Sequence, residues 1–303
     1  MELTPSTANN GRRADGVRSF SNGERRREEL ADFLRTKRAS LQPEDVGLPD
    51  GGRRRTPGLR REEVAMLAGV GATWYTWLEQ GRDVRASLEV LEALSRALRL
   101  SAAERSHVIL LGRGEQAGPC KAPAEEVSPT LRRLVENTGP GPVYLLGRRW
   151  DYLAWNSAFE HVFNWEPGPD PLSRNHIWVW FMDPSRRSLC STDWATSARL
   201  LVAKFRADSA RNIGDPAFEE LISALESSSP EFRKLWKRHE VAGSGTGRKD
   251  LNHPVVGPLV FDHAVFNHGD LGEQRLVVYS PSCEQDTPSK LAQLVAQDGA
   301  AAR

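Results

Sequence analysis

Residues 61–82, REEVAMLAGVGATWYTWLEQGR, hold the pattern that decides the fold of the first part of the chain. Apolar residues recur at helical spacing on both sides of Gly69, which predicts two short helices at about 60–68 and 72–80. Glycine adopts positive φ at little cost, so Gly69 allows a sharp turn between the helices, and Gly81 ends the second one. Ala65 is small enough for close approach. The outer side of the second helix is then left free at the surface.

Three more helices are predicted around this pair. Apolar stripes mark one over about 28–41 and another over about 88–98. A third begins after a capping box formed by Ser101 and Glu104. Pro and Gly residues break the chain between 42 and 58, and again over about 112–127, where GRGEQAGPCKAPAEEV is typical of a linker.

Composition and charge divide the chain in the same place. Its 303 residues suggest about two domains of ~100–200 residues each. Residues 1–114 contain 20 Lys and Arg against 16 Asp and Glu, whereas the remainder contains 21 against 24. A mildly basic first part beside an acidic second part suits a nucleic-acid partner at the N-terminal end only.

The cysteines and the apolar runs indicate where the protein resides. Cys120, Cys190 and Cys283 lie far apart without a C-x-x-C motif, which argues against a disulfide framework or a Cys-based zinc site and fits a reducing environment. No run approaches the ~18–20 apolar residues that span a membrane. Residues 1–27 lack the apolar core of a signal peptide, so we expect a disordered arm. The sequence therefore predicts a cytoplasmic protein.

Beyond the linker, strand and helix patterns alternate in blocks. Strands are predicted at 142–147, 150–155, 258–266 and 275–280, where apolar residues alternate with a period of two, as in Val143 with Leu145 and Leu276 with Val278. Helices are predicted between the strand pairs at 194–212, 216–227 and 230–239. Strands, then helices, then strands favour an α+β domain with a mainly antiparallel sheet.

No catalytic signature is found in the sequence. GSGTGRK at 243–249 lacks the spacing of a phosphate-binding loop and is better interpreted as a surface turn. His263 and His268 would point to opposite faces of a strand, because an odd separation reverses the side. No G-x-S-x-G motif occurs. We therefore expect no enzyme activity, no metal site and no cofactor.

The first domain resembles the helix-turn-helix of the XRE/Cro-repressor family over about 28–112, through EVA at 63–65, GV at 69–70 and LEQG at 78–81. This resemblance implies that helix 72–80 enters the major groove of duplex DNA and that Glu79 pairs with Arg38. The residues implied to face the groove are Ala72, Thr73, Thr76 and Trp77. The residues that suit phosphate contacts are Arg60, Arg61, Arg82 and Arg85, and Arg53, Arg54 and Arg55 could reach the backbone or the minor groove.

The second domain resembles the MmyB-like ligand-binding domain through RRWDYLAWN at 148–156, IWVWFMDP at 177–184, FRADSARNIGDP at 205–216 and SSPEFRKLWKRHEV at 228–241. The resemblance implies a PAS-like fold and an apolar effector of fatty-acid type. Candidate pocket walls are Trp155, Phe159, Phe163, Trp178, Phe181, Trp194, Phe205 and Trp236. Asn156 could hold a head group, and Arg206 or Arg233 could meet a carboxylate.

The combined prediction is a multi-domain regulator. Its parts are a disordered arm at 1–27, an all-α helix-turn-helix domain at 28–112, a linker at 113–127, the α+β PAS-like domain at 128–297 and a tail at 298–303. Operators commonly have two half-sites, so we expect a homodimer on double-stranded DNA.

Three alternatives remain open from the residues themselves. The aromatic residues could form a solid core, and Arg206 and Arg233 could pair with acids such as Asp208 and Glu231. The second domain could bind another protein instead of a small molecule. It could also be an enzyme with a DNA-binding appendage.

Overall fold

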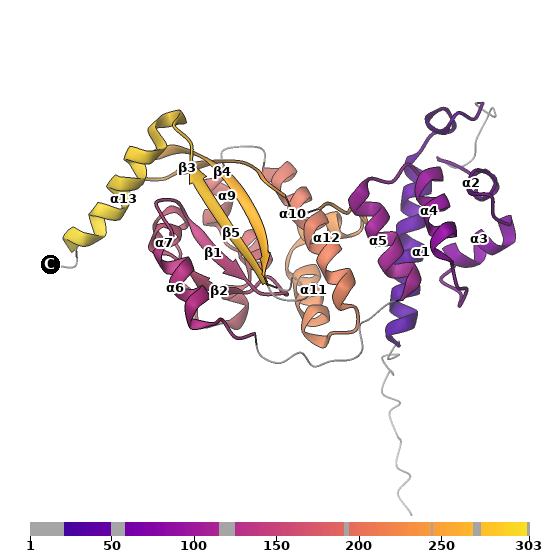
Figure 1. Cartoon of the computed structure of the whole chain (residues 1–303), viewed down its shortest axis with the longest axis horizontal. Helices are drawn as coiled ribbons and strands as arrows, with labels where there is room; N and C mark the ends of the chain where they lie inside the picture. The colour runs from indigo at the N-terminus through magenta and orange to yellow at the C-terminus, as the bar shows by residue number, and fades with distance from the viewer. Residues whose placement is uncertain are drawn as a thin grey trace, which may run out of the picture.

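The computed structural model describes residues 21–49, 58–114, 125–190, 194–243, 245–268 and 274–301. A helical unit lies beside a unit built on a sheet (Figure 1). Residues 1–20 of the predicted arm and 115–124 of the predicted linker lie outside the described residues.

The first helix starts earlier than predicted. It begins at Asn22, where Ser21 and Glu24 form a capping box, so residues 22–27 of the predicted arm are helical. The correction has a simple cause: NGERRR carries no apolar stripe, and the capping signal alone marks the start.

The helical unit confirms the predicted helix pair and its surroundings. Within the described residues its helices are α1 (Asn22–Ser40), the 3₁₀ helix η1 (Pro43–Val46), α2 (Arg61–Ala68), α3 (Ala72–Glu79), α4 (Leu88–Ala97) and α5 (Ala102–Arg113). Gly69 ends α2 with φ 68°, the left-handed conformation that the tight turn requires. Phe33, Val64 and Tyr75 are fully buried in the core that the helices share.

The second unit is built on an antiparallel sheet, as predicted. Its strands are β1 (Val143–Leu146), β2 (Tyr152–Trp155), β3 (Gly247–His253), β4 (Gly257–His268) and β5 (Gln274–Pro281), in the spatial order β2-β1-β5-β4-β3. β3 was not predicted, and the interpretation of 243–249 as a surface turn is wrong for residues 247–249. GRKDLNH is polar, and its pairing with β4 from Gly247 to His253 makes it a strand.

Helices cover both faces of the sheet. Leu131 and Val135 of α6 pack against Leu145 and Ala154 on one face. The larger core lies on the other face. The helices of this unit are α6 (Pro129–Asn137), α7 (Ser157–Phe163), α8 (His176–Met182), α9 (Pro184–Leu189), α10 (Trp194–Ser209), α11 (Pro216–Ser228), α12 (Pro230–Trp236) and α13 (Thr287–Ala301), with 3₁₀ turns η2 (Pro171–Arg174), η3 (Ala210–Asn212) and η4 (Glu284–Asp286). α13 thus continues into the predicted tail.

Candidate DNA interface, ligand cavity and domain junction

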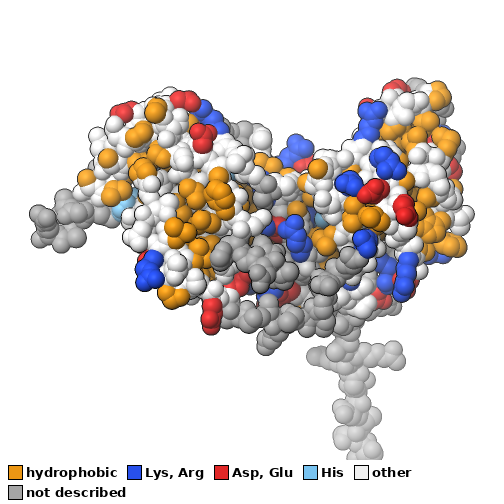
Figure 2. Space-filling model, in the orientation of Figure 1, with side chains coloured by type: hydrophobic (Ala, Val, Ile, Leu, Met, Phe, Trp, Pro, Cys, Tyr) orange, Lys and Arg blue, Asp and Glu red, His pale blue; other side chains and the backbone are white. Residues whose placement is uncertain are grey.

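Helix α3 exposes the side that the sequence predicted. Ala72 and Thr73 are exposed and Trp77 is 40 % exposed, whereas Tyr75 and Leu78 on the opposite side are buried. Thr76 is half-buried and its hydroxyl donates to the carbonyl of Ala72 at 2.9 Å. The helix lies at the edge of the molecule remote from the sheet, and Figure 2 shows basic side chains gathered over the helical unit. This placement leaves α3 accessible to a groove of DNA.

The arginines beside α3 divide into free and engaged groups. Arg60, Arg82 and Arg85 are exposed, and the guanidinium of Arg82 lies 5.9 Å from the ring centre of Trp77. Arg61 differs, because its Nε donates to the carboxylate of Glu79 at 2.6 Å. Arg53, Arg54 and Arg55 lie outside the described residues.

Glu79 holds α3 against α1. Its buried carboxylate accepts hydrogen bonds from Arg38 at 2.5 Å, from Arg61 and from the hydroxyl of Tyr75 at 2.9 Å, which confirms the predicted pair with Arg38. Burial alone would raise the pKa of Glu79, but the hydrogen bonds from Arg38 and Arg61 outweigh it and lower the pKa. The charged network fixes the orientation of α3 relative to α1 and α2.

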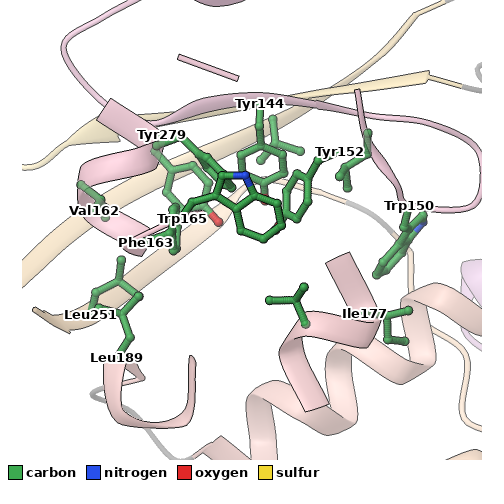
Figure 3. Close-up of a cluster of buried hydrophobic side chains, with 14 of the residues drawn as sticks. Tyr144, Trp150, Tyr152, Val162, Phe163, Trp165, Ile177, Leu189, Leu251 and Tyr279 are labelled. Atoms are coloured by element: carbon green, nitrogen blue, oxygen red, sulfur yellow. The ribbon is translucent and has the colours of Figure 1, made fainter. Parts of the chain in front are cut away.

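A cavity of about 270 Å³ lies between the sheet and helices α7 to α10. Aromatic and aliphatic side chains make up most of its wall. The lining residues are Tyr144, Leu146, Trp150, Tyr152, Phe159, Phe163, His176, Val179, Trp180, Arg186, Leu189, Cys190, Ser197, Leu200, Leu201, Lys204, Arg248, Lys249, Asp250, Leu251, His263, Val265, Arg275, Val277 and Tyr279. In Figure 3 the rings of Tyr144, Tyr152 and Tyr279 lie close together, with Leu189 and Leu251 below them.

Several cavity residues are polar or charged, and among them His176 and the tyrosines are held in uncharged forms. The hydroxyl of Tyr152 lies 2.5 Å from Nδ1 of His176. Burial lowers the pKa of His176 to about 3, so its imidazole is neutral. Burial also raises the pKa of Tyr144 and Tyr279, so their hydroxyls stay protonated. Apart from the buried guanidinium of Arg186, which lies 5.1 Å from the ring centre of Phe163, this part of the wall offers hydrogen bonds without charge.

Two of the predicted wall residues, Phe159 and Phe163, line the cavity. The structure places the other candidates elsewhere: they are Trp155, Asn156, Trp178, Phe181, Trp194, Phe205, Arg206 and Trp236. Trp155 donates from Nε1 to Glu160, and the rings of Phe181 and Trp194 pack on each other outside the cavity. Arg233 caps the end of α11 by donating to the carbonyls of Glu226 and Ser227.

Asn156 is a structural residue. Its side-chain oxygen accepts from the backbone N–H groups of Val143 and Phe159, at 2.9 and 3.0 Å. Its amide donates to the carbonyls of Thr138 and Gly141, at 2.7 and 2.9 Å. These four bonds engage the amide group and leave no capacity for a head group.

Arg206 lies in a junction between the two units. Its side chain is 1 % exposed, pairs with Glu29 of α1 and stacks 3.8 Å from the ring centre of Trp236. Burial alone would raise the pKa of Glu29, but the neighbouring His239 and Arg206 outweigh it and lower the pKa to about 2. The surface is hollowed between the two units (Figure 2).

Sequence reasoning missed the tyrosines and lysines of the cavity. The apolar alternation singled out Val143, Leu145, Leu276 and Val278, which pack on the α6 side of the sheet. The residues between them face the cavity, as Tyr144 and Val277 do. The period of two could therefore have identified these two positions once the opposite face was considered.

The described residues were also compared with the requirements of a metal site and of a membrane-spanning helix. No group of three or more metal-ligating side chains occurs among the described residues. None of the described helices is both long and apolar enough to cross a bilayer.

Comparison with known proteins assigns each unit. No curated protein matches the chain. Residues 29–108 match the model of a helix-turn-helix domain. Residues 127–294, more than half of the chain, match the model of the MmyB-like transcription regulator ligand binding domain. The chain belongs to the MmyB-like transcription regulators, as a DNA-binding protein with a ligand-binding C-terminal domain.

Proposed function

We propose that the protein is a homodimeric regulator whose affinity for its operator is set by a small apolar ligand of fatty-acid type. The observation that carries the proposal is the cavity of about 270 Å³, whose wall is mostly aromatic and aliphatic and also carries polar and cationic side chains. Ligand sites in proteins have this composition. The antiparallel sheet with helices that enclose a cavity also supports the PAS-like assignment of this domain.

A role as a protein-interaction module is less well supported. Such a module would present a contiguous apolar patch with exposed aromatic residues. The large exposed hydrophobic residues described in this unit come from different elements: they are Leu134, Met182, Leu200, Val255, Phe266 and Val295. Phe266 is the one aromatic residue among them, whereas most described aromatic rings of the unit are buried or half-buried.

The route from ligand to DNA runs through α10. Leu201 and Lys204 of this helix line the cavity, and Arg206, half a turn further along, pairs with α1 of the helix-turn-helix unit. Asp208 accepts from Trp150 Nε1 at 2.9 Å and pairs with Arg275, and both of these partners line the cavity. A ligand that favours one position of α10 thereby favours one position of α1.

The ligand part of the proposal is tested by native mass spectrometry of the full chain, followed by operator titration. Operators come from genomic footprinting. We expect a co-purified apolar acid and a changed operator affinity after its removal. The ligand class would be contradicted if the protein carried no lipid and its affinity for DNA did not change when decanoic acid was added.

The DNA part is tested on α3. We expect Thr73→Ala combined with Trp77→Ala to abolish preference for the operator over random DNA while the fold persists, because both exposed side chains are in position to face the groove. Arg85→Ala is the comparison: it should weaken binding to all sequences and reduce the salt dependence by about one phosphate contact. Unchanged operator affinity of the double variant in a gel-shift titration would refute this assignment of α3.

A further inference from the structure

The charge inside the cavity is unbalanced. Its wall holds five cationic side chains, and each of the three arginines has a carboxylate nearby. Arg248 pairs with Glu284 at 2.6 Å and Asp250 at 2.9 Å. Arg275 pairs with Asp208, and Nε of Arg186 lies 3.7 Å from Asp183. The side chains of the two lysines of the wall, Lys204 and Lys249, make no hydrogen bond or ion pair within the described part of the chain.

The two lysines approach the cavity from different elements. Lys204 comes from α10 and Lys249 from β3, which lines the far side of the pocket. Both are half-buried, and Nζ of Lys249 lies 4.5 Å from the ring centre of Trp180. Burial lowers the pKa of both lysines, and the charge of Lys249 further lowers the pKa of Lys204. Asp250 partly offsets the charge of Lys249, but the repulsion between the two lysines is a cost in free energy to the unliganded protein.

Unpaired charges in a partly buried apolar site require an explanation. Buried charges in proteins are normally paired, because transfer of an ion out of water is costly. An anion placed between Lys204 and Lys249 would remove this cost and gain charge-assisted hydrogen bonds. The apolar part of the wall, with Leu189, Leu251 and Val265, suits an alkyl chain.

We infer that Lys204 and Lys249 together bind the acidic head group of the effector, with its apolar chain extending along the tyrosine and leucine side of the cavity. This inference rests on the proposed function and specifies which residues select the ligand. It replaces Arg206 and Arg233, which are engaged in the domain junction and at the end of α11.

The test compares two ligands that differ only in charge. Full-length, delipidated protein is titrated with decanoic acid and with decan-1-ol by isothermal calorimetry. We expect the acid to bind about tenfold or more tightly than the alcohol. Lys204→Met and Lys249→Met keep an apolar side chain of similar length, and each should lose most of that preference without weakening alcohol binding. Lys234→Met, on the exposed part of α12, removes one charge outside the cavity and should leave the preference intact.

The outcomes separate this inference from the proposed function. Equal binding of acid and alcohol by the wild-type protein would overturn the role of the lysines and leave the apolar ligand class standing. Failure of both to bind while operator binding persists would overturn the ligand class itself. Lys249→Arg keeps the charge, so it should retain much of the preference for the acid over the alcohol. This result would show that the loss in Lys249→Met comes from the missing charge and not from misfolding. Persistence of the full preference in both methionine variants would also overturn the inference.

Discussion

At the scale of single residues, Glu79 and His107 are both buried, but Glu79 is charged and His107 is neutral. Glu79 keeps its charge because Arg38, Arg61 and Tyr75 donate to it. His107 is 3 % exposed, and neither ring nitrogen has a hydrogen-bond partner among the described residues. Burial lowers its pKa to about 4, because the charged imidazolium is poorly tolerated there. His107 therefore acts as a neutral ring that packs 5.1 Å from the centre of Phe33.

We expect His107→Leu to stabilise the protein at mildly acidic pH. The unfolded imidazole has a pKa of about 6.5, whereas the folded one has a pKa of about 4. Between these values the unfolded state binds more protons, so wild-type stability falls as pH falls from about 6.5 to about 4. Leucine does not titrate, so the variant keeps stability on the order of 3 kcal/mol that the wild type loses across this window.

Urea unfolding across this pH range measures the effect. The comparison is the change in unfolding free energy between mildly alkaline and mildly acidic pH, in which any difference in packing between His107 and leucine cancels. Loss of stability below this window should persist in the variant, because Glu29 titrates there. Parallel pH profiles of the two proteins would show that His107 is not held neutral.

At the scale of elements, alternation along β5 separates the cavity from the outer face of the sheet. Arg275, Val277 and Tyr279 line the cavity, whereas Leu276 and Val278 pack toward α6. Adjacent residues of one strand therefore belong to different environments. Each pair of neighbours offers a matched test of what the cavity does.

We expect Val277→Phe to abolish decanoic acid binding, because the larger side chain occupies the space that the ligand needs. Val278→Phe, one residue along, enlarges a half-buried side chain on the α6 face and should leave ligand affinity within about twofold. Calorimetric titration of both variants measures the difference, and near-ultraviolet circular dichroism checks that each is folded. Equal affinity of the Val277 variant and the wild type would place the ligand outside this cavity.

The same elements show how far the sequence predicts the fold. Apolar periodicity predicts α2 to α5 and four of the five described strands, because burial of one face imposes a period of 3.6 or 2. It misses the polar first turns of α1 and the polar strand β3, which form through a capping box and through pairing with β4. Apolar periodicity does not report on either contribution.

The site was less predictable than the fold. Aromatic content indicates a pocket or a core without distinguishing them, so most predicted wall residues pack elsewhere. Lys204 and Lys249 carry no local signal, because which side of α10 and β3 meets the cavity depends on how the sheet and helices pack. Exposed positions of α3 were easier, since the buried side of that helix is apolar in the sequence itself.

At the scale of the whole molecule, the two units share a core. Ala210 and Val241 of the second unit belong to the hydrophobic cluster of the helical unit, and the buried Arg206–Glu29 pair lies beside it. A shared core of this kind resists free rotation of one unit against the other. Ligand-dependent movement of α10 would therefore be transmitted to α1 and, through Glu79, to the recognition helix.

We expect Glu29→Gln to weaken the coupling between ligand and DNA. The variant leaves Arg206 buried without its anion, so the position of α10 no longer favours one position of α1. Coupling is measured as the ratio of operator affinities with and without saturating decanoic acid; a wild-type ratio of about 5- to 150-fold is typical of such systems. In the variant the ratio should fall toward one, while decanoic acid still binds to the cavity.

An ion pair elsewhere on the junction supplies the control. Arg25 of α1 pairs with Glu219 of α11, and both side chains are about one-third exposed, at 34 % and 38 %. Exposed pairs contribute little, so Glu219→Gln should keep the wild-type ratio although it also removes a contact between the units. If both variants reduced the ratio of operator affinities equally, the loss of coupling would come from a general loosening of the junction. If the Glu29 variant kept the wild-type ratio of operator affinities, Arg206 would not transmit the effect of the ligand to the DNA. The ligand would then have to act through the shared apolar core.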